Sequence, residues 1–154
     1  MKTKILFICT GNSARSQMAE AFTCHYGSDM LEVYSAGLEP SRVNPRAIAV
    51  MAEKGISLDG QWSKGLDAVP VDDVDLVITL CGDADARCPL ISGRLGRRHW
   101  PLPDPAKATG TDDDILAVFR RVRDDIEQRV QALVGELSKA WFQADVGLIF
   151  HTSS

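Results

Sequence analysis

Residues 4–16 read KILFICTGNSARS, in which an unbroken apolar run ends at Cys9 and a polar loop follows. An apolar run without alternation is typical of a parallel strand that is covered on both faces. A helix is predicted over residues 16–26, with Met18 and Phe22 on one face and Gly27 as its left-handed C-terminal cap. We therefore expect a strand, a loop and a helix in succession, with Cys9 at the carboxyl end of the strand.

The loop from Cys9 to Arg15 has the spacing Cys-x5-Arg and the composition of an oxyanion site. Only a thiolate attacks, and a free thiol has a pKa of about 8.5, so a reactive Cys9 needs positive potential around it. The loop amides, the N-terminus of the next helix and the Arg15 guanidinium supply that potential, and Ser16 is placed to donate to the sulfur. The predicted anion-binding residues are Thr10, Gly11, Asn12, Ser13, Ala14, Arg15 and Ser16. The alternative interpretation is a buried structural cysteine, followed by an arginine by chance.

Three more strands are predicted, over residues 31–35, 75–80 and 97–102. Helical segments separate them, so we expect an α/β fold with one parallel sheet, right-handed crossovers and helices on both faces. Ligands of such sheets bind beyond the carboxyl ends of the strands. The sequence places Cys9, Cys81 and Asp104 there.

Two more helices show apolar residues at helical spacing. The shorter one lies between residues 44 and 55, which supply an Asn cap and a Gly stop, and is expected to bury Ile48, Met51 and Ala52. The longer one spans residues 112–137, with three acids in its first turn that suit the positive end of the helix dipole.

Size and composition indicate one cytoplasmic domain. A chain of 154 residues fits a single domain that buries about 68–70% of its unfolded surface. The formal net charge of −4 argues against a nucleic-acid partner, and no apolar run approaches the ~20 residues that span a membrane. The N-terminal residues lack a signal-peptide pattern, so a cytoplasmic location is expected. The four cysteines should then be reduced at rest, and Cys24 is assigned to packing.

Residues 9–20, CTGNSARSQMAE, resemble the low-molecular-weight protein tyrosine phosphatase superfamily and, within it, the thioredoxin-coupled arsenate reductases. Supporting stretches lie at residues 34–37, 44–48, 75–89 and 99–106. The segment around Cys81 separates the reductases from the phosphatases. The resemblance covers residues 1–138 and implies one domain with a four-stranded parallel sheet, flanked by helices, in the strand order 2-1-3-4. Residues 139–154 form a C-terminal tail to which the resemblance assigns no role.

The resemblance implies that arsenate is reduced to arsenite by a relay of three thiols. Cys9 attacks arsenate, Arg15 and the loop amides hold its oxygens, and Asp104 protonates the departing oxygen. Cys81 then attacks Cys9, which releases arsenite, and Cys88 attacks Cys81 to leave a Cys81–Cys88 disulfide for thioredoxin. The implied partners are arsenate and thioredoxin. We expect a monomer without a bound cofactor or metal, since Cys-x6-Cys lacks the paired spacing of a zinc site.

A disulfide between Cys81 and Cys88 constrains the segment between them. An intact helix over these seven steps would separate the two Cα atoms by about 10 Å, beyond the ~7 Å that a disulfide allows. We therefore expect residues 82–89 to form an exposed switch that unwinds on oxidation. Asp83 and Asp85 are interpreted as its solvated rim.

Two positions depart from the family pattern. Many relatives have a further cysteine where this chain has Ala14, and we expect turnover to survive that change because the relay cysteines are all present. Relatives that bind potassium beside the loop use an Asn, a Glu, a Ser and an Asp. Asn12, Glu20 and Ser35 match, whereas Lys64 occupies the Asp position. Our hypothesis is that the ammonium group replaces potassium; the alternative is a solvated loop lysine.

Two other functions stay open at this point. The same loop would serve a phosphatase that hydrolyses aryl phosphates, and aromatic residues flanking the pocket would favour it, whereas the pair Cys81 and Cys88 disfavours it. A non-catalytic module would bind an oxyanion or arsenite without consuming reducing equivalents.

Overall fold

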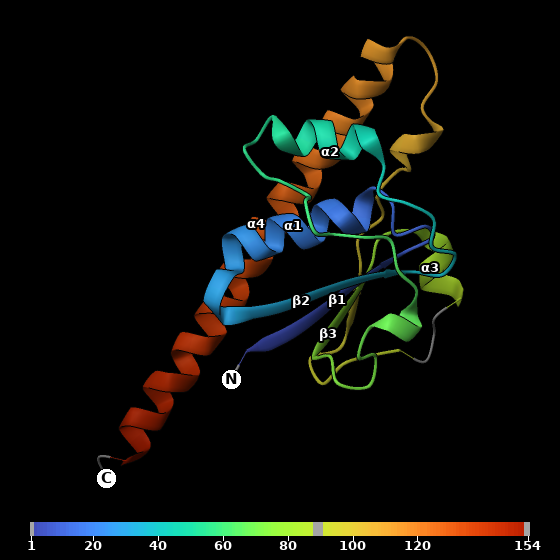
Figure 1. Cartoon of the computed structure of the whole chain (residues 1–154). Coiled ribbons are helices and arrows are strands. Elements are labelled where there is room, and N and C mark those ends of the chain that lie inside the picture. The colour runs from blue at the N-terminus through green and yellow to red at the C-terminus, as the bar shows by residue number, and fades with distance from the viewer. Residues whose placement is uncertain (1, 88–90, 153–154) are drawn as a thin grey trace.

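The computed structural model describes residues 2–87 and 91–152, and for Ser28 and residues 141–152 it describes the backbone only. Its strands are β1 (Thr3–Cys9), β2 (Leu31–Gly37), β3 (Leu76–Thr79) and β4 (Arg97–His99). They form one parallel sheet in the order β2-β1-β3-β4, which confirms the expected fold (Figure 1).

The helices are α1 (Arg15–Gly27), α2 (Pro45–Ala52), α3 (Gly82–Arg87) and α4 (Asp112–Thr152). Helix α1 packs against β1, β2 and α4, and α4 also contacts α2. Short 3-10 turns lie at Ser28–Met30, Leu66–Ala68 and Pro105–Lys107. Helix α3 lies at the carboxyl end of β3, on the side of the molecule where the catalytic loop was expected (Figure 1).

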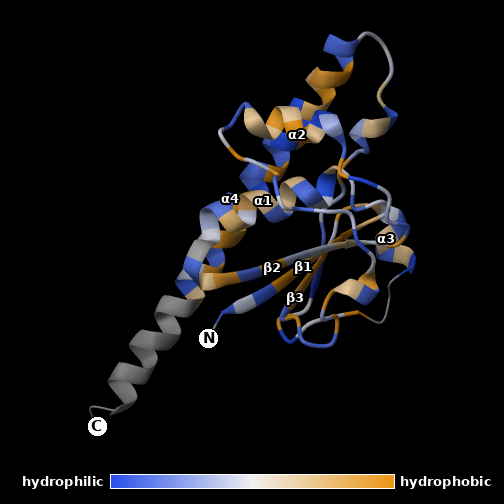
Figure 2. Cartoon of the chain, viewed as in Figure 1, coloured by the Kyte–Doolittle hydropathy of each residue, from blue (hydrophilic) through white to orange (hydrophobic). Residues whose placement is uncertain are grey.

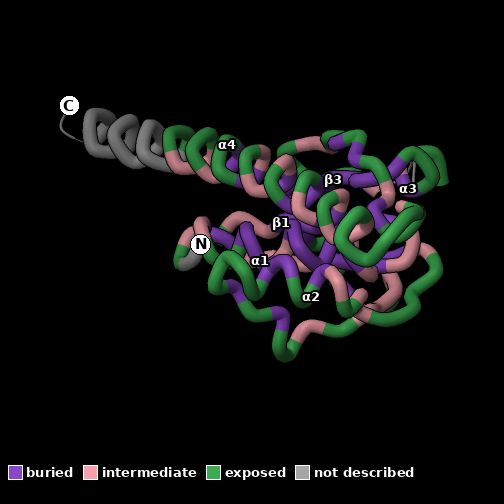
Figure 3. The backbone as a smooth tube through the Cα atoms, turned by 90° about the horizontal axis from the view of Figure 1, so that it is seen from above, coloured by how far each residue is buried: buried purple, intermediate pink, exposed green. Residues whose placement is uncertain are grey.

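Strand β1 is the centre of the core. Its neighbours in the sheet are β2 and β3, and the side chains from Ile5 to Ile8 are fully buried. Each such aliphatic or aromatic side chain contributes about 1.5–3 kcal/mol through removal from water. Most of β1 and all of β3 lie in the buried interior of the molecule, with exposed residues around them (Figure 3). The unbroken apolar run is explained by this position, because both faces of β1 are covered.

Gly27 does not cap α1 as predicted. It has φ −92° and ψ −24°, which is right-handed helical, and the chain continues directly into the 3-10 turn Ser28–Met30. A Cβ at Gly27 would lie 2.4 Å from Cδ1 of Leu31. The residue is therefore explained by the close approach of β2 rather than by a left-handed turn.

The predicted buried face of α2 is correct at Met51 and wrong at Ile48 and Ala52. The helix buries Ala47, Val50 and Met51, whereas Ile48 is 43% exposed and Ala52 is exposed. Both sets have helical spacing, so periodicity alone did not separate them. The predicted ends are confirmed, since the side chain of the cap at position 44 accepts from the amide of residue 46 and Gly55 has φ +73°.

Helix α4 does not end at Leu137 but continues to Thr152. No proline follows Leu137 to interrupt it. Along its described side chains α4 alternates between polar and apolar residues, which is typical of an amphipathic helix (Figure 2). Its C-terminal part extends away from the sheet (Figure 1). None of the helices in the described part of the chain has the length and apolar content needed to cross a membrane.

Glu53 joins the end of α2 to α4. Its carboxylate accepts hydrogen bonds from Nη2 of Arg120 at 2.8 Å and from Nη1 of Arg123 at 2.7 Å. The same Arg123 nitrogen donates to the carbonyl of Val50 at 2.9 Å. The hydrogen bonds from Arg120 and then Arg123 outweigh desolvation and lower the pKa of Glu53 to about 2.

We expect Glu53→Gln to lower the free energy of unfolding at pH 7, by an amount that screening limits because the side chain is 41% exposed. An unfolded glutamate has a pKa of about 4.3, so the stabilisation is complete above that pH and is lost as the pH falls toward the folded value. Urea unfolding at pH 7, 4 and 3 should show the gap between wild type and variant closing, with Asp72→Asn, an exposed loop change, as the control. An equal gap at pH 7 and pH 3 would contradict this assignment.

Candidate active site

Cys9 ends β1 and is buried, with 2% of its surface exposed. Its Sγ lies 2.9 Å from Oγ of Ser16, at the start of α1. Nδ2 of Asn12 donates to the same Ser16 oxygen at 2.8 Å. Either atom can donate in the Cys9–Ser16 contact, and a Cys9 thiolate would accept from the Ser16 hydroxyl. The predicted Ser16 contact is therefore present.

The loop carbonyls bond to the chain that follows β2. The carbonyls of Cys9, Thr10 and Gly11 accept from the amides of residues 38, 39 and 41, and that of Ser13 accepts from the amide of residue 44. In a trans peptide the C=O and the next N–H point in opposite directions. The N–H groups that follow these carbonyls therefore point away from the chain after β2, which is compatible with an anion site formed by the loop amides.

Gly37 permits this packing of the loop against β2. A Cβ on Gly37 would lie 2.7 Å from the backbone nitrogen of Asn12 and 2.8 Å from the carbonyl oxygen of Thr10. Both contacts are with backbone, which cannot move aside without displacing the loop. The glycine is therefore required by the close approach of the two segments.

Asn12 has φ +47°, a left-handed conformation that asparagine tolerates better than most residues. Nε2 of Gln17 holds it there by donating to its backbone oxygen at 2.9 Å and to its Oδ1 at 3.0 Å. Gln61 in turn donates to Oε1 of Gln17 at 2.7 Å. Sequence reasoning missed Gln17 and Gln61. In the sequence Gln17 is simply a polar residue on the predicted helix, and its full burial is seen only in the structure.

A pocket of about 250 Å³ opens over the loop. Its lining residues are Cys9, Thr10, Gly11, Ser13, Ala14, Arg15, Ser41, Asp104 and Ala106. Most predicted anion-binding residues thus meet in one place. The side chains of Asn12 and Ser16 are fully buried and support the loop from behind.

Arg15 and Asp104 face each other across this pocket. Nη1 of Arg15 donates to the carbonyl of Leu102 at 3.1 Å, and its Nη2 lies 3.8 Å from Oδ2 of Asp104. Asp104 also caps a 3-10 turn, because its Oδ1 accepts from the amide of Ala106 at 3.0 Å. The amide of Ala106 and the guanidinium of Arg15 contact different oxygens of the Asp104 carboxylate, and Oδ2 is the oxygen that lies toward Arg15.

Cys81 follows β3 and is 8% exposed. Its Sγ lies 3.2 Å from Oγ1 of Thr10 and accepts from the amide of Ala84 at 3.3 Å. Thr10 directly follows Cys9, so one loop residue contacts the second thiol. Among the described residues Cys9, Cys24 and Cys81 are free thiols, and Cys88 lies outside the described residues.

Cys24 is exposed on α1, so its assignment to packing was wrong. Residue 24 lies on the outer face of the helix, opposite the buried positions that contact the sheet.

The four residues of the expected cation site also come together. Nζ of Lys64 lies 3.4 Å from Oγ of Ser35 and 3.7 Å from Oε1 of Glu20, and it donates to the carbonyl of Trp62 at 3.1 Å. Nδ2 of Asn12 donates to the same Ser35 oxygen at 3.0 Å. A chain of polar contacts thereby connects the ammonium group with Asn12 and the loop.

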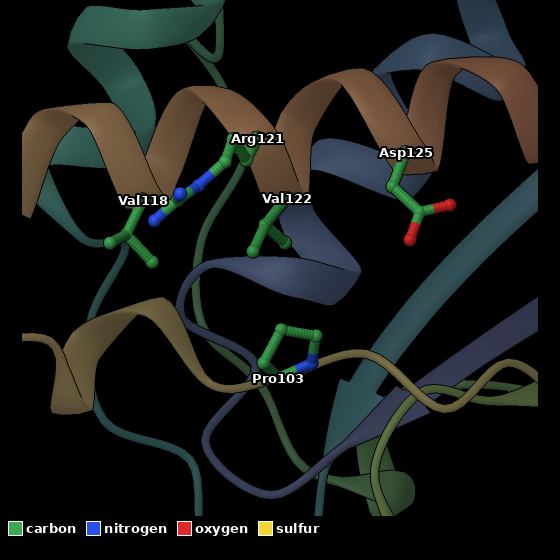
Figure 4. A pocket seen from close by; sticks show the side chains of 5 residues that line it. All are labelled: Pro103, Val118, Arg121, Val122 and Asp125. Atoms are coloured by element: carbon green, nitrogen blue, oxygen red, sulfur yellow. The ribbon is translucent and has the colours of Figure 1, made fainter.

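A larger pocket of about 380 Å³ lies between α4 and the segment before Asp104. Val122 points toward Pro103, while Arg121 and Asp125 come from the same helix (Figure 4). Among the described residues, neither a thiol nor a histidine lines it. The candidate active site is therefore the smaller pocket, which contains Cys9.

Known proteins share this arrangement. The sequence model of the low molecular weight phosphotyrosine protein phosphatase family matches residues 4–143. An arsenate reductase from Shouchella clausii (strain KSM-K16) is 49% identical over 130 residues, which are 84% of this chain and 94% of the relative. A solved arsenate reductase in its phosphate-binding state is 40% identical and has a TM-score of 0.75, over 88% of this chain and 98% of its own. A thioredoxin-dependent arsenate reductase from Corynebacterium glutamicum is 26% identical, with a TM-score of 0.70 over 90% of this chain and 63% of its own. The chain belongs to the low molecular weight phosphotyrosine protein phosphatase family.

Proposed function

We propose that the protein is an arsenate reductase that uses Cys9, Cys81 and Cys88 in sequence and is regenerated by thioredoxin. The observation that carries the proposal is the position of Cys81, which follows the strand next to β1 and contacts Thr10 of the oxyanion loop. Hydrolysis of a phosphate ester requires one nucleophile, whereas reduction requires a second thiol near the first. Relatives with high identity are arsenate reductases, and one structural relative is thioredoxin-dependent.

The first step joins Cys9 to arsenic. The Cys9 thiolate attacks arsenate, one oxygen leaves as water, and Asp104 supplies a proton to it. The loop amides and Arg15 hold the remaining oxygens, with Arg15 fixed in place by the carbonyl of Leu102.

The next steps transfer electrons between sulfurs. The Cys81 thiolate attacks Sγ of Cys9, the S–As bond breaks, and its electron pair reduces As(V) to As(III), which leaves as arsenite. Cys88 then attacks Cys81 and releases Cys9 as a thiolate. Thioredoxin supplies two electrons and reopens the Cys81–Cys88 disulfide.

Mass spectrometry tests the route directly. Fully reduced protein should be treated with one equivalent of arsenate, quenched with acid, alkylated and digested. We expect a Cys81–Cys88 disulfide and one equivalent of arsenite. Arsenate-dependent NADPH oxidation with thioredoxin and thioredoxin reductase should follow in steady state. Absence of the bond in protein that has consumed arsenate would contradict the relay.

A phosphatase is the second candidate, because the family includes phosphatases and Cys9 with Arg15 suffices for hydrolysis. The named residues that line the pocket include no aromatic side chain. We therefore expect only slow hydrolysis of p-nitrophenyl phosphate. A non-catalytic binding module would bind arsenate without oxidising NADPH, and the same assay distinguishes it.

We further propose that the Lys64 ammonium serves in place of potassium beside the loop. The wild-type rate should be equal in potassium and sodium salts. Lys64→Met should lower kcat/KM by about tenfold, which corresponds to losing one charged hydrogen bond of ~1.5 kcal/mol. Lys54→Met, which breaks an ion pair with Glu127 away from the loop, is the matched control. Strong stimulation of wild type by potassium would contradict the proposal.

A further inference from the structure

Helix α3 is too short to be stable by itself. It has six residues, Gly82–Arg87, and isolated helices shorter than about 12–15 residues are marginal in water. Ala84 is the residue of α3 that is buried. Polar contacts with the sheet must therefore supply much of what keeps the segment helical.

Asp85 makes those contacts. Its Oδ1 accepts from Oγ1 of Thr79 at 3.1 Å and from Nη2 of Arg97 at 3.2 Å, and the same Arg97 nitrogen donates to the Asp85 backbone carbonyl at 2.6 Å. These hydrogen bonds, that from Thr79 first, lower the pKa of the Asp85 carboxyl. The Asp85 side chain is 43% exposed, as expected for a residue on the rim, but its partners at residues 79 and 97 belong to β3 and β4 and tie it to the sheet.

Arg97 holds both flanks of the segment that contains Cys88. Its Nη2 binds residue 85 as above, and its Nη1 donates to the carbonyl of Ile91 at 3.1 Å. The Arg97 side chain is 17% exposed and that of Asp85 is 43% exposed, so the guanidinium is sheltered while the carboxylate is partly open to solvent. One guanidinium thus connects the chain before and after residues 88–90.

Asp83 is the natural comparison on the same helix. Its carboxylate pairs with Arg87 at 3.1 Å, within α3, and the Arg87 side chain also reaches Glu39 at 3.3 Å. These three groups are 46–69% exposed. Surface pairs of this kind contribute little. Asp85 differs in that its partners belong to the sheet and are more buried, with Thr79 0% exposed and the Arg97 side chain 17% exposed.

We propose that Asp85, Thr79 and Arg97 form a latch that sets the dithiol–disulfide equilibrium of Cys81 and Cys88. This inference rests on the relay proposed above. Forming the disulfide removes two electrons and two protons from the thiols and requires α3 to unwind. The latch bonds exist while α3 is helical, so they stabilise the dithiol form and make the disulfide easier for thioredoxin to reduce. Asp85 is a positioning residue here, since it touches neither substrate nor sulfur.

The test compares Asp85→Ala with Asp83→Ala. Both remove one acid from the same short helix and introduce the same residue, so helix propensity and the interaction with the helix dipole are closely matched. Each protein is equilibrated with oxidised and reduced dithiothreitol, and the Cys81–Cys88 disulfide is measured by mass spectrometry. Asp85→Ala should shift the equilibrium constant toward the disulfide about tenfold, which is ~30 mV for a two-electron couple. Asp83→Ala should shift it less than about twofold, as expected for an exposed pair.

Hydrogen exchange supplies a readout that does not depend on the disulfide. In reduced protein the amides of residues 84–87 should exchange faster in Asp85→Ala than in wild type. Thr79→Val removes one latch donor at constant shape. It should change the amide exchange and the disulfide equilibrium in the same directions as Asp85→Ala. Equal equilibrium constants or equal protection in Asp85→Ala and wild type would overturn the latch and leave the relay intact. A wild-type protein that forms no Cys81–Cys88 disulfide in oxidised buffer would overturn the relay, and the latch with it.

Discussion

Replacing Cys9 by serine should lower both arsenate reduction and p-nitrophenyl phosphate hydrolysis by about 10³-fold or more, as removal of a nucleophile does in other enzymes. Both reactions begin with attack by the same sulfur, which lies at the base of the pocket and is oriented by Ser16. A serine hydroxyl is a much weaker nucleophile, because it stays protonated at neutral pH whereas a thiol ionises far more readily. Initial rates with each substrate, measured on the same preparations, give the comparison.

Cys81→Ser and Cys88→Ser should separate the two activities. Each should abolish steady-state reduction, because the Cys9–arsenic adduct or the Cys9–Cys81 disulfide then has no acceptor, and each should leave hydrolysis within about twofold of wild type. Cys24→Ser, at an exposed cysteine of α1, is the control that keeps both activities. Sustained thioredoxin-dependent turnover by Cys81→Ser would be incompatible with the proposed route.

The parts of the site that adjoin strand ends were predictable from the sequence. In a parallel sheet the carboxyl ends of neighbouring strands lie side by side, so Cys9 and Cys81 meet once β1 and β3 are recognised as strands. The length of the apolar run was enough to identify β1. The Cys-x5-Arg spacing identified the loop only together with the preceding strand, Gly11, the hydroxyl residues and the start of the next helix.

The supports of the site were not predictable in the same way. Gln17 reaches Trp62, and Asp85 reaches Arg97, through contacts between segments whose distance in space no local pattern encodes. The prediction of the buried face of α2 was wrong for a similar reason. Two faces of the helix had the required apolar spacing, and only the packing against α4 selects one of them.

Among substitutions that keep all three relay cysteines, a change at Arg15 should have the largest effect on activity. Arg15→Lys is expected to lower kcat/KM for both arsenate and p-nitrophenyl phosphate by about 10²–10³-fold, the loss seen when one oxyanion-stabilising donor is removed. A lysine keeps the charge but has one nitrogen, and it cannot bind the carbonyl of Leu102 while it also presents two parallel donors to the oxyanion.

Arg121→Lys is the matched control for this change, because Arg121 lies in the neighbouring pocket on α4 and the substitution is chemically identical (Figure 4). It should leave both activities within about twofold, as expected for a side chain outside the catalytic pocket. Inhibition by phosphate gives an independent measure, because Arg15→Lys should weaken phosphate binding together with turnover, whereas Arg121→Lys should not. Near-normal phosphate inhibition in Arg15→Lys would show that the loop amides alone hold the oxyanion and that the guanidinium acts elsewhere.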